Sequence, residues 1–195
     1  MANESMVNSL RIRVWDAPTR IFHWSLALAF SVAMLTSESE RWRDLHVTAG
    51  YTLAGLLAFR LLWGAVGSRY ARFSEFWPRP QAIIDYVKSI LAGKPQHFVG
   101  HNPLGAIAIF LLLGLGALTA LSGWLLYREF GGHRLGEALE EMHEAFAYGM
   151  LTVVAIHLCG VAVGSVLHRE NLIAAMLTGY KERKGADNES VAGRG

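Results

Sequence analysis

Four long apolar stretches constrain this chain more than any other feature of its sequence. They cover residues 19–36, 45–66, 104–127 and 142–168. A helix needs about 20 mostly apolar residues to cross the hydrocarbon core of a bilayer, and stretches of roughly 18 are already candidates. Only 17% of the 195 residues are charged, against about 25% in an average soluble domain. The pattern therefore predicts an all-α membrane protein, built as a bundle of four transmembrane helices.

The remaining residues form polar tails and connections. We expect a polar N-terminal tail over residues 1–15, one membrane domain over residues 16–180 and a disordered C-terminal tail over residues 181–195. The acidic segment 128–141 is interpreted as a connection. The longest connection covers residues 67–103, and five of its aliphatic residues share one helical face: Ile83, Ile84, Val87, Ile90 and Leu91. This face predicts a short amphipathic helix on the membrane surface.

Lysine and arginine residues are distributed unevenly around the predicted spans. If four helices cross the membrane, 14 of these residues lie on the side of both termini and 4 lie on the opposite side. Segments rich in Lys and Arg remain in the cytoplasm, so both termini are predicted to be cytoplasmic. The N-terminal residues lack the basic and then apolar pattern of a cleaved signal peptide. We therefore expect the first apolar stretch to be a retained span.

Four histidines lie in the apolar stretches at two matching depths. His143 and His157 are 14 residues apart, which in a helix is a rise of about 21 Å with both side chains within about 40° of one face. Because successive spans alternate in direction, His46 lies at the outer depth of His143, and His23 lies at the inner depth of His157. An ionisable side chain inside a membrane is costly, so it is a functional-site hypothesis by default.

Two imidazoles on facing helices are the axial ligands that a bis-histidine haem b needs. We therefore predict two haems b, one held by His46 and His143 and the other held by His23 and His157. With both axial positions of the iron filled by protein, the expected chemistry is one-electron transfer. The chain has one cysteine and no CxxCH motif, so these haems are expected to be held without covalent bonds.

Cationic residues near the inner histidines are candidates for binding haem propionates. Arg20 lies one turn before His23, and Arg60 lies at the inner depth. We expect Arg20 or Arg60 to contact the propionates of the inner haem. Together with His168, these arginines also mark the cytoplasmic level at which we place a quinone site. His97, His101 and His133 lie in connections, where we expect solvated side chains.

Other interpretations of the histidines remain open. A single membrane histidine commonly forms a hydrogen bond between helices, although four histidines at two matching depths disfavour this reading. A transition-metal carrier also uses histidine, but its path normally includes carboxylates or further sulfur ligands. A membrane anchor without haem is a related alternative. His168 is either part of a quinone pocket or an interfacial side chain near the last carbonyls of its helix.

Three segments of the chain resemble the prokaryotic cytochrome b561 family. They are WDAPTRIFHW at 15–24, RLLWGAVGSRYARF at 60–73 and HRENLIAAMLTGYKE at 168–182. The resemblance covers about residues 11–182 and is closest to the branch of b-type cytochrome subunits of nickel-iron hydrogenases. It implies a four-helix di-haem bundle in the bacterial inner (plasma) membrane that exchanges electrons with quinones and a partner protein. Its haem ligands correspond to His23, His46, His143 and His157.

We therefore expect electron transfer across the membrane between the quinone pool and a periplasmic redox partner. This partner is a c-type cytochrome or a hydrogenase-like subunit. The alternative is a stand-alone superoxide:quinone oxidoreductase, which another branch of the family exemplifies. In that case three arginines at the outer side would attract the anion: Arg41, Arg43 and Arg128. We favour the electron-transfer subunit, and we assign no catalytic residue and no nucleic-acid partner.

Overall fold

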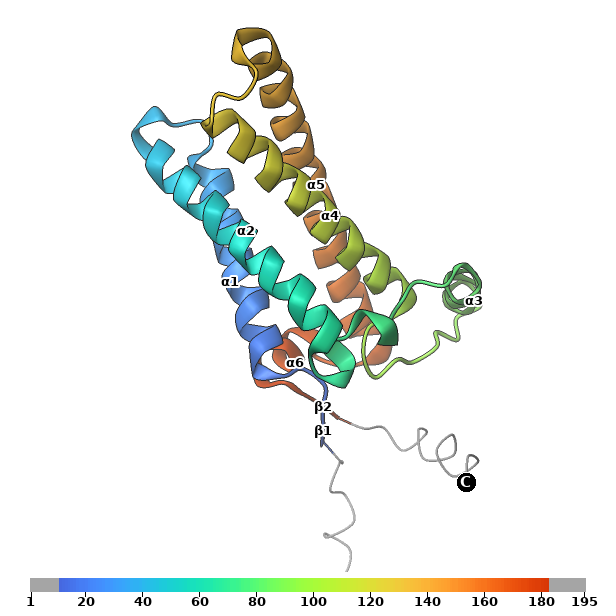
Figure 1. The fold of residues 1–195 in the computed structure, drawn as a ribbon. Coiled ribbons are helices and arrows are strands. Elements are labelled where there is room, and N and C mark those ends of the chain that lie inside the picture. Colours follow the sequence, from blue (N-terminus) through green and yellow to red (C-terminus); the bar gives the residue numbers. More distant parts are fainter. Residues whose placement is uncertain (1–10, 183–195) are drawn as a thin grey trace, which may run out of the picture.

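The computed structural model describes residues 11–182, most of which are helical (Figure 1). The four long helices are α1 (Ala17–Thr36), α2 (Arg43–Val66), α4 (Pro103–Tyr127) and α5 (Gly132–His168). They alternate in direction, and the closest packing is between α4 and α5 and between α1 and α2. The result is an up-down-up-down bundle, which agrees with the order of the apolar stretches in the sequence.

Three of the helical segments are long and apolar enough to cross a membrane. They are Glu40–Val66, Pro103–Tyr127 and Leu135–His168. The outer surface of the bundle is also apolar, since Leu35 is 84% exposed and Val166 is 80% exposed. Large apolar side chains of this kind are costly in water but suit a lipid environment. Helix α1 is not among the three segments, because Arg20 and His23 lower the hydropathy of its first two turns.

We call the end of the bundle that holds both described chain ends the terminal end. There β1 (Arg11–Arg13) pairs antiparallel with β2 (Tyr180–Glu182), next to α6 (Leu172–Thr178) (Figure 1). The opposite end holds η1 (Glu40–Trp42), between α1 and α2, and the turn between α4 and α5. The strands and α6 were not predicted, and they differ from the expected tails at residues 11–13 and 181–182. The rest of those tails, residues 1–10 and 183–195, lies outside the described residues.

Helix α5 differs most from the sequence-based expectation. It begins at Gly132, whereas the predicted span began at residue 142 and segment 128–141 was interpreted as a connection. Its 37 residues measure about 55 Å, nearly twice the hydrocarbon thickness of a bilayer, about 30 Å. Leucine, alanine and glutamate are good helix formers, so the acidic residues continue the helix rather than end it. The first turns of α5 project beyond the other helices (Figure 1).

The connection between α2 and α4 contains helix α3 (Pro80–Leu91), as the spacing of its aliphatic residues predicted. Two short 3-10 turns precede it, η2 (Arg69–Ala71) and η3 (Phe73–Glu75). The aromatic ring of Phe73 packs directly against Gly64 of α2, where a Cβ atom would overlap the ring. The connection is therefore fastened to the terminal end of the bundle.

Candidate functional site

His46 and His143 face each other near the opposite end of the bundle, with their ring centroids 6.1 Å apart. Each ring is fixed through its Nδ1 atom. Nδ1 of His46 donates to the carbonyl oxygen of Ala33 at 2.9 Å, and Nδ1 of His143 donates to that of Thr119 at 2.9 Å. A carbonyl oxygen only accepts hydrogen bonds, so the proton is assigned to Nδ1. The lone pair of Nε2 is then available to a metal in both residues.

His23 of α1 and His157 of α5 form a second pair nearer the terminal end, with ring centroids 6.5 Å apart. The ring of His23 also packs edge-to-face against Trp24 at 5.1 Å. In contrast to the first pair, Nδ1 of His23 is buried without a hydrogen-bond partner among the described residues. Helix α5 thus contributes one imidazole to each of two pairs at different depths.

An apolar layer separates the two pairs. Phe30, Leu53 and Met150 are buried together in the centre of the bundle. Each lies seven residues from the paired histidine of its own helix, and seven residues are about 10 Å of helix. Met150, which is 2% exposed, is midway in sequence between the two histidines of α5. This layer joins α1, α2 and α5 and excludes water between the two pairs.

The ring separations fit a metal held between two imidazoles. Metal–nitrogen bonds to histidine are about 2.0–2.1 Å, and the ring centroid lies about 1 Å beyond the nitrogen, so the centroids would be roughly 6 Å apart. The described part of the chain has no group of three or more His, Cys, Asp or Glu side chains that could hold a bare metal ion. Two axial histidines are, however, the complete protein ligand set of a low-spin haem, since the porphyrin supplies the other ligands.

Several buried polar atoms at the terminal end have no hydrogen-bond partner among the described residues. They are Thr19 Oγ1, Arg20 Nε, His23 Nδ1, Arg60 Nη1, Arg72 Nε and His101 Nδ1. Of the two predicted propionate ligands, Arg20 and Arg60, Arg60 is the more buried, with 4% of its surface exposed. Its guanidinium carbon lies 4.6 Å from the ring centroid of Phe73. A buried guanidinium nitrogen without a hydrogen-bond acceptor is unfavourable. The guanidinium nitrogens of Arg20 and Arg60 therefore fit a bound anionic group such as a haem propionate.

Residues 14–179 match the family model described as prokaryotic cytochrome b561. The chain belongs to the prokaryotic cytochrome b561 family. It is similar to proteins named "Probable Ni/Fe-hydrogenase B-type cytochrome subunit". That of Rhodobacter capsulatus is 22% identical over 93% of this chain and 85% of its own length. That of Rhizobium leguminosarum bv. viciae is 26% identical over 93% of this chain and 94% of its own length.

A similar protein of Escherichia coli K12, named "Probable Ni/Fe-hydrogenase 1 B-type cytochrome subunit", is 24% identical over 88% of this chain and 91% of its own length. No solved structure matches the chain. The family and these relatives confirm the resemblance seen in the sequence. The chain is thus an integral membrane protein, and a b-type cytochrome of electron transport for which haem b is the implied cofactor.

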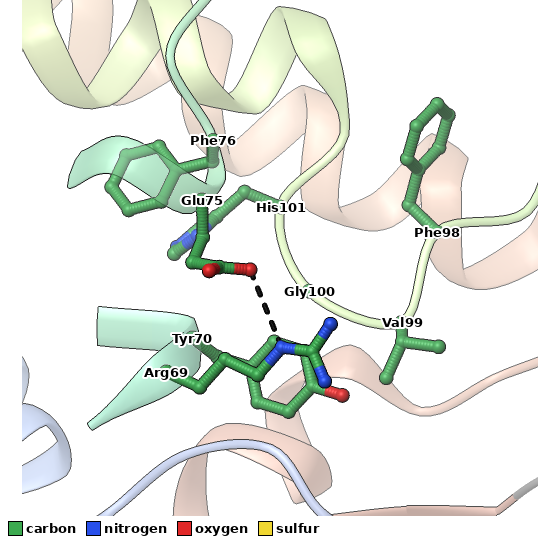
Figure 2. Close-up of a pocket in the computed structure, with 8 residues that line it drawn as sticks. All are labelled: Arg69, Tyr70, Glu75, Phe76, Phe98, Val99, Gly100 and His101. Carbon is green, nitrogen blue, oxygen red and sulfur yellow. Dashed lines mark hydrogen bonds and ion pairs between the residues drawn. The ribbon is translucent and has the colours of Figure 1, made fainter. Parts of the chain in front are cut away.

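The terminal end of the cytochrome contains a cavity of about 230 Å³ beside η2 and the segment that leads into α4 (Figure 2). Its lining residues are Arg69, Tyr70, Glu75, Phe76, Phe98, Val99, Gly100 and His101. Arg69 and Glu75 form an ion pair at 3.3 Å across one side of it (Figure 2). The cavity therefore combines the aromatic rings of Tyr70, Phe76 and Phe98 with one ion pair and one imidazole.

His101 is not the solvated side chain expected from its position in a connection. Its ring lies between Phe76, at 4.3 Å, and Trp15, at 4.6 Å between centroids. Burial, with smaller contributions from the positive charges of Arg60 and Lys181, lowers the pKa of His101 to about 3. The imidazole is therefore neutral at pH 7. The sequence did not indicate this environment, because the neighbouring rings of Trp15 and Phe76 come from distant parts of the chain.

His168 belongs to a polar cluster at the terminal end rather than to either histidine pair. Its ring lies 5.5 Å from that of His97, and Nε2 of His97 is 2.7 Å from a carboxylate oxygen of Glu170. The same carboxylate is 3.7 Å from Nζ of Lys181. His97 is thus also paired rather than simply solvated. His133 lies in the first turn of α5 rather than in a connection, and its side chain is 87% exposed, with Nδ1 3.4 Å from a carboxylate oxygen of Glu137.

Proposed function

We propose that this cytochrome carries electrons across the membrane, through two bis-histidine haems b, between the quinone pool and a periplasmic redox partner. The two imidazole pairs, with ring centroids 6.1 and 6.5 Å apart, carry the proposal. Bound haem iron supplies the one-electron chemistry. The protein supplies the ligands, orients them, and keeps water out of the layer between the two pairs.

The proposal includes α1 as a fourth span. Its 20 residues measure about 30 Å, which equals the hydrocarbon thickness of a bilayer, and it packs along α2. With four spans, 11 of the 15 Lys and Arg residues among the described residues lie on the side of the terminal end, so we place this end in the cytoplasm. His46 and His143 then form the outer pair, and His23 and His157 form the inner pair.

The terminal end supports the quinone half of the proposal. The buried Arg60 and the partly buried Arg20 carry guanidinium nitrogens without partners. We propose that they bind propionates of the inner haem, and that a quinone binds nearby in the cytoplasmic half of the bundle. The cavity next to His101 combines aromatic rings with an ion pair and an imidazole, and binding sites for small molecules likewise combine aromatic side chains with placed polar groups. His168, with His97 and Glu170, would lie at the cytoplasmic surface near this site, although none of the three lines the cavity itself.

The opposite end supports the periplasmic half. Helix α5 extends about 10 residues beyond the start of its predicted span, and this extension exposes Glu137, Glu140 and Glu141. Such an acidic projection beside the outer pair would steer a partner with a basic surface. Because the similar proteins are named as cytochrome subunits of Ni/Fe-hydrogenases, we propose a hydrogenase-like subunit as the partner, with a c-type cytochrome as the second choice.

A superoxide:quinone oxidoreductase is the second candidate function. The observation that favours it is the exposure of Arg41 and Arg43, which lie three to five residues before His46. These cations would raise the local concentration of a small anion near the outer haem. If the cytochrome instead works with a protein partner, Arg41 and Arg43 would bind haem propionates or lipid headgroups.

Reconstitution of the purified cytochrome in liposomes tests both functions. We expect a lipid-soluble quinol to reduce the haems, which is measured as growth of the absorption band of the reduced haem. Superoxide should reduce the haems no faster than the background rate measured without quinol. Failure of every quinol, with a hydrophilic donor still effective, would remove the quinone half of the proposal. Rapid superoxide-driven quinone reduction by the chain alone would favour the second candidate.

A further inference from the structure

Helix α3 leaves one apolar side uncovered. Tyr86, in the middle of the helix, is 4% exposed, and its ring packs edge-to-face against that of Phe98 at 5.5 Å between centroids. On the side turned away from Tyr86, the side chains of Ile84, Val87 and Leu91 are exposed, and Leu91 is 82% exposed. These three positions fall within about 60° of one another around a helix. We call them the outward face of α3.

The segment after α3 prevents the outward face from turning toward the bundle. The backbone N–H of Lys94 donates to the carbonyl oxygen of Ser89 at 2.9 Å, and that of Gln96 donates to Oγ of Ser89 at 3.2 Å. The hydroxyl of Ser89 donates in turn to the carbonyl oxygen of Tyr86 at 2.7 Å. Rotation of α3 about its axis would therefore strain this segment and expose the ring of Tyr86.

The position of α3 matches the boundary between lipid and water. Figure 1 shows α3 nearly end-on, beside the part of α4 nearest the terminal end, so it lies across the bundle axis. Trp77, just before α3, is 64% exposed, and its ring lies 5.1 Å from that of Phe110, about 10 Å along α4 from its first residue. Tryptophan is enriched at this boundary. Leu104 and Leu111 of α4 are also exposed, so the outward face continues the apolar surface of the bundle.

Basic side chains border the outward face. Lys88 lies beside it on the helix, Arg79 directly precedes α3 and Lys94 follows it; all three are exposed. The carboxylate of Asp85, in the same helix, accepts from the side-chain amide of Gln81 at 2.9 Å. An amphipathic helix with basic residues beside its apolar face is attracted to a membrane surface that carries negative charge.

We propose that the outward face of α3 inserts into the leaflet on the side of the terminal end, and that Arg79, Lys88 and Lys94 bind the phosphates of anionic phospholipids there. The flexible stems of lysine and arginine allow their charges to reach the headgroups while the aliphatic side chains contact acyl chains. The basic border disfavours a second copy of this chain as the occupant, because two copies would bring like charges together. This binding goes beyond electron transfer and does not depend on the haems.

The depth of the outward face can be measured with spin labels in liposomes of equal parts phosphatidylcholine and phosphatidylglycerol. The label is attached through Ile84→Cys, in a Cys159→Ser background because Cys159 is exposed. Gln96→Cys, in the exposed segment after α3, is the control. Oxygen concentrates in lipid, whereas a nickel chelate remains in water. We expect oxygen collisions to dominate at position 84 and nickel collisions to dominate at position 96.

Two results of this measurement would overturn the inference. Nickel access at position 84 as high as at position 96 would show that the outward face lies in water. Protection of position 84 from both reagents would show that a protein, either a partner or a second copy of this chain, covers the face. Haem content, measured on the same samples, reports on the proposed function separately.

Native mass spectrometry of the detergent-solubilised cytochrome, titrated with either lipid, tests the headgroup preference. The wild-type chain should bind its first phosphatidylglycerol more tightly than its first phosphatidylcholine. Lys88→Gln with Lys94→Gln should reduce this preference, on the order of fivefold for each charge. Arg11→Gln with Arg13→Gln removes two exposed cations from β1 at the same end of the bundle and should leave it unchanged. An unaltered preference in the lysine variant, or an equal loss in both variants, would overturn the inference.

Discussion

Asp16 joins the start of α1 to the end of α2, and its removal should destabilise the protein measurably. Its Oδ1 caps α1 by accepting from the backbone N–H of Thr19 at 2.7 Å, and its Oδ2 accepts from Nε1–H of Trp63 at 3.0 Å. Loss of an N-cap costs about 1 kcal/mol. Loss of a hydrogen bond to a charged acceptor costs about 1.5–3 kcal/mol. We therefore expect Asp16→Ala to lower the free energy of unfolding by roughly 2–4 kcal/mol.

Unfolding in mixed micelles with increasing dodecyl sulfate, followed by circular dichroism, measures this loss. Asp16→Asn should cost about half as much, because its amide oxygen can replace only one of the two acceptors. Asp85→Ala is the control, since Asp85 only accepts from Gln81 on the exposed helix α3, and it should change stability by less than about 0.5 kcal/mol. The reasoning is refuted if Asp16→Ala and Asp85→Ala are equally stable.

The pH dependence of Asp16 follows from the same contacts. Burial acts to raise the pKa of Asp16, but hydrogen bonds from Ser68, Thr19 and Trp63 outweigh it and lower the pKa below its ordinary value of 3.8. The unfolded chain then takes up the proton first as the pH falls. The stability that Asp16 contributes is thus complete above its unfolded pKa and is lost as the pH drops through its folded pKa.

Three further substitutions test other parts of the account. The pKa of His101, held at about 3 by burial, means that only the unfolded chain binds this proton between pH 3 and about 6.5. The free energy of unfolding should therefore fall by up to about 1.4 kcal/mol for each pH unit by which the pH is lowered through that range. His101→Phe should reduce this slope in thermal unfolding. Met150→Ala should cost about 2–5 kcal/mol in micelle unfolding while both haems stay bound; loss of one haem would show that Met150 does more than pack. Arg60→Met should lower the retention of one haem, measured after gel filtration, and unchanged retention would exclude Arg60 as a propionate ligand.

The depths of the histidines could be read from the sequence because helical geometry is regular over long distances. A separation of 14 residues places two side chains on one face of any α-helix, and alternating spans then put His46 level with His143 and His23 level with His157. The apolar composition likewise indicated the long helices. Their ends were less predictable: α5 extends to Gly132 because good helix formers continue past the apolar residues that mark a membrane span.

The contacts that hold the rings could not be predicted. The acceptors for the outer pair are backbone carbonyl oxygens of Ala33 and Thr119, and every residue type has such an oxygen. The close approach of His143 to Gly123, where a Cβ atom would lie 2.8 Å from Cε1 of the ring, depends on the rotation of α4 relative to α5, which a lone glycine in an apolar helix does not reveal. His101 shows the same limit, since its neighbours Trp15 and Phe76 reach it only after the chain has folded.

The most direct test of the account is a pyridine haemochrome count on detergent-purified protein, together with oxidised and reduced absorption spectra. We predict two haems b per chain with low-spin, bis-histidine spectra, and one remaining haem in each of His46→Ala and His157→Ala, with different spectra in the two variants. One haem in the wild-type chain would contradict the pairing of the four histidines. A folded, membrane-inserted chain without haem would contradict the di-haem electron path altogether.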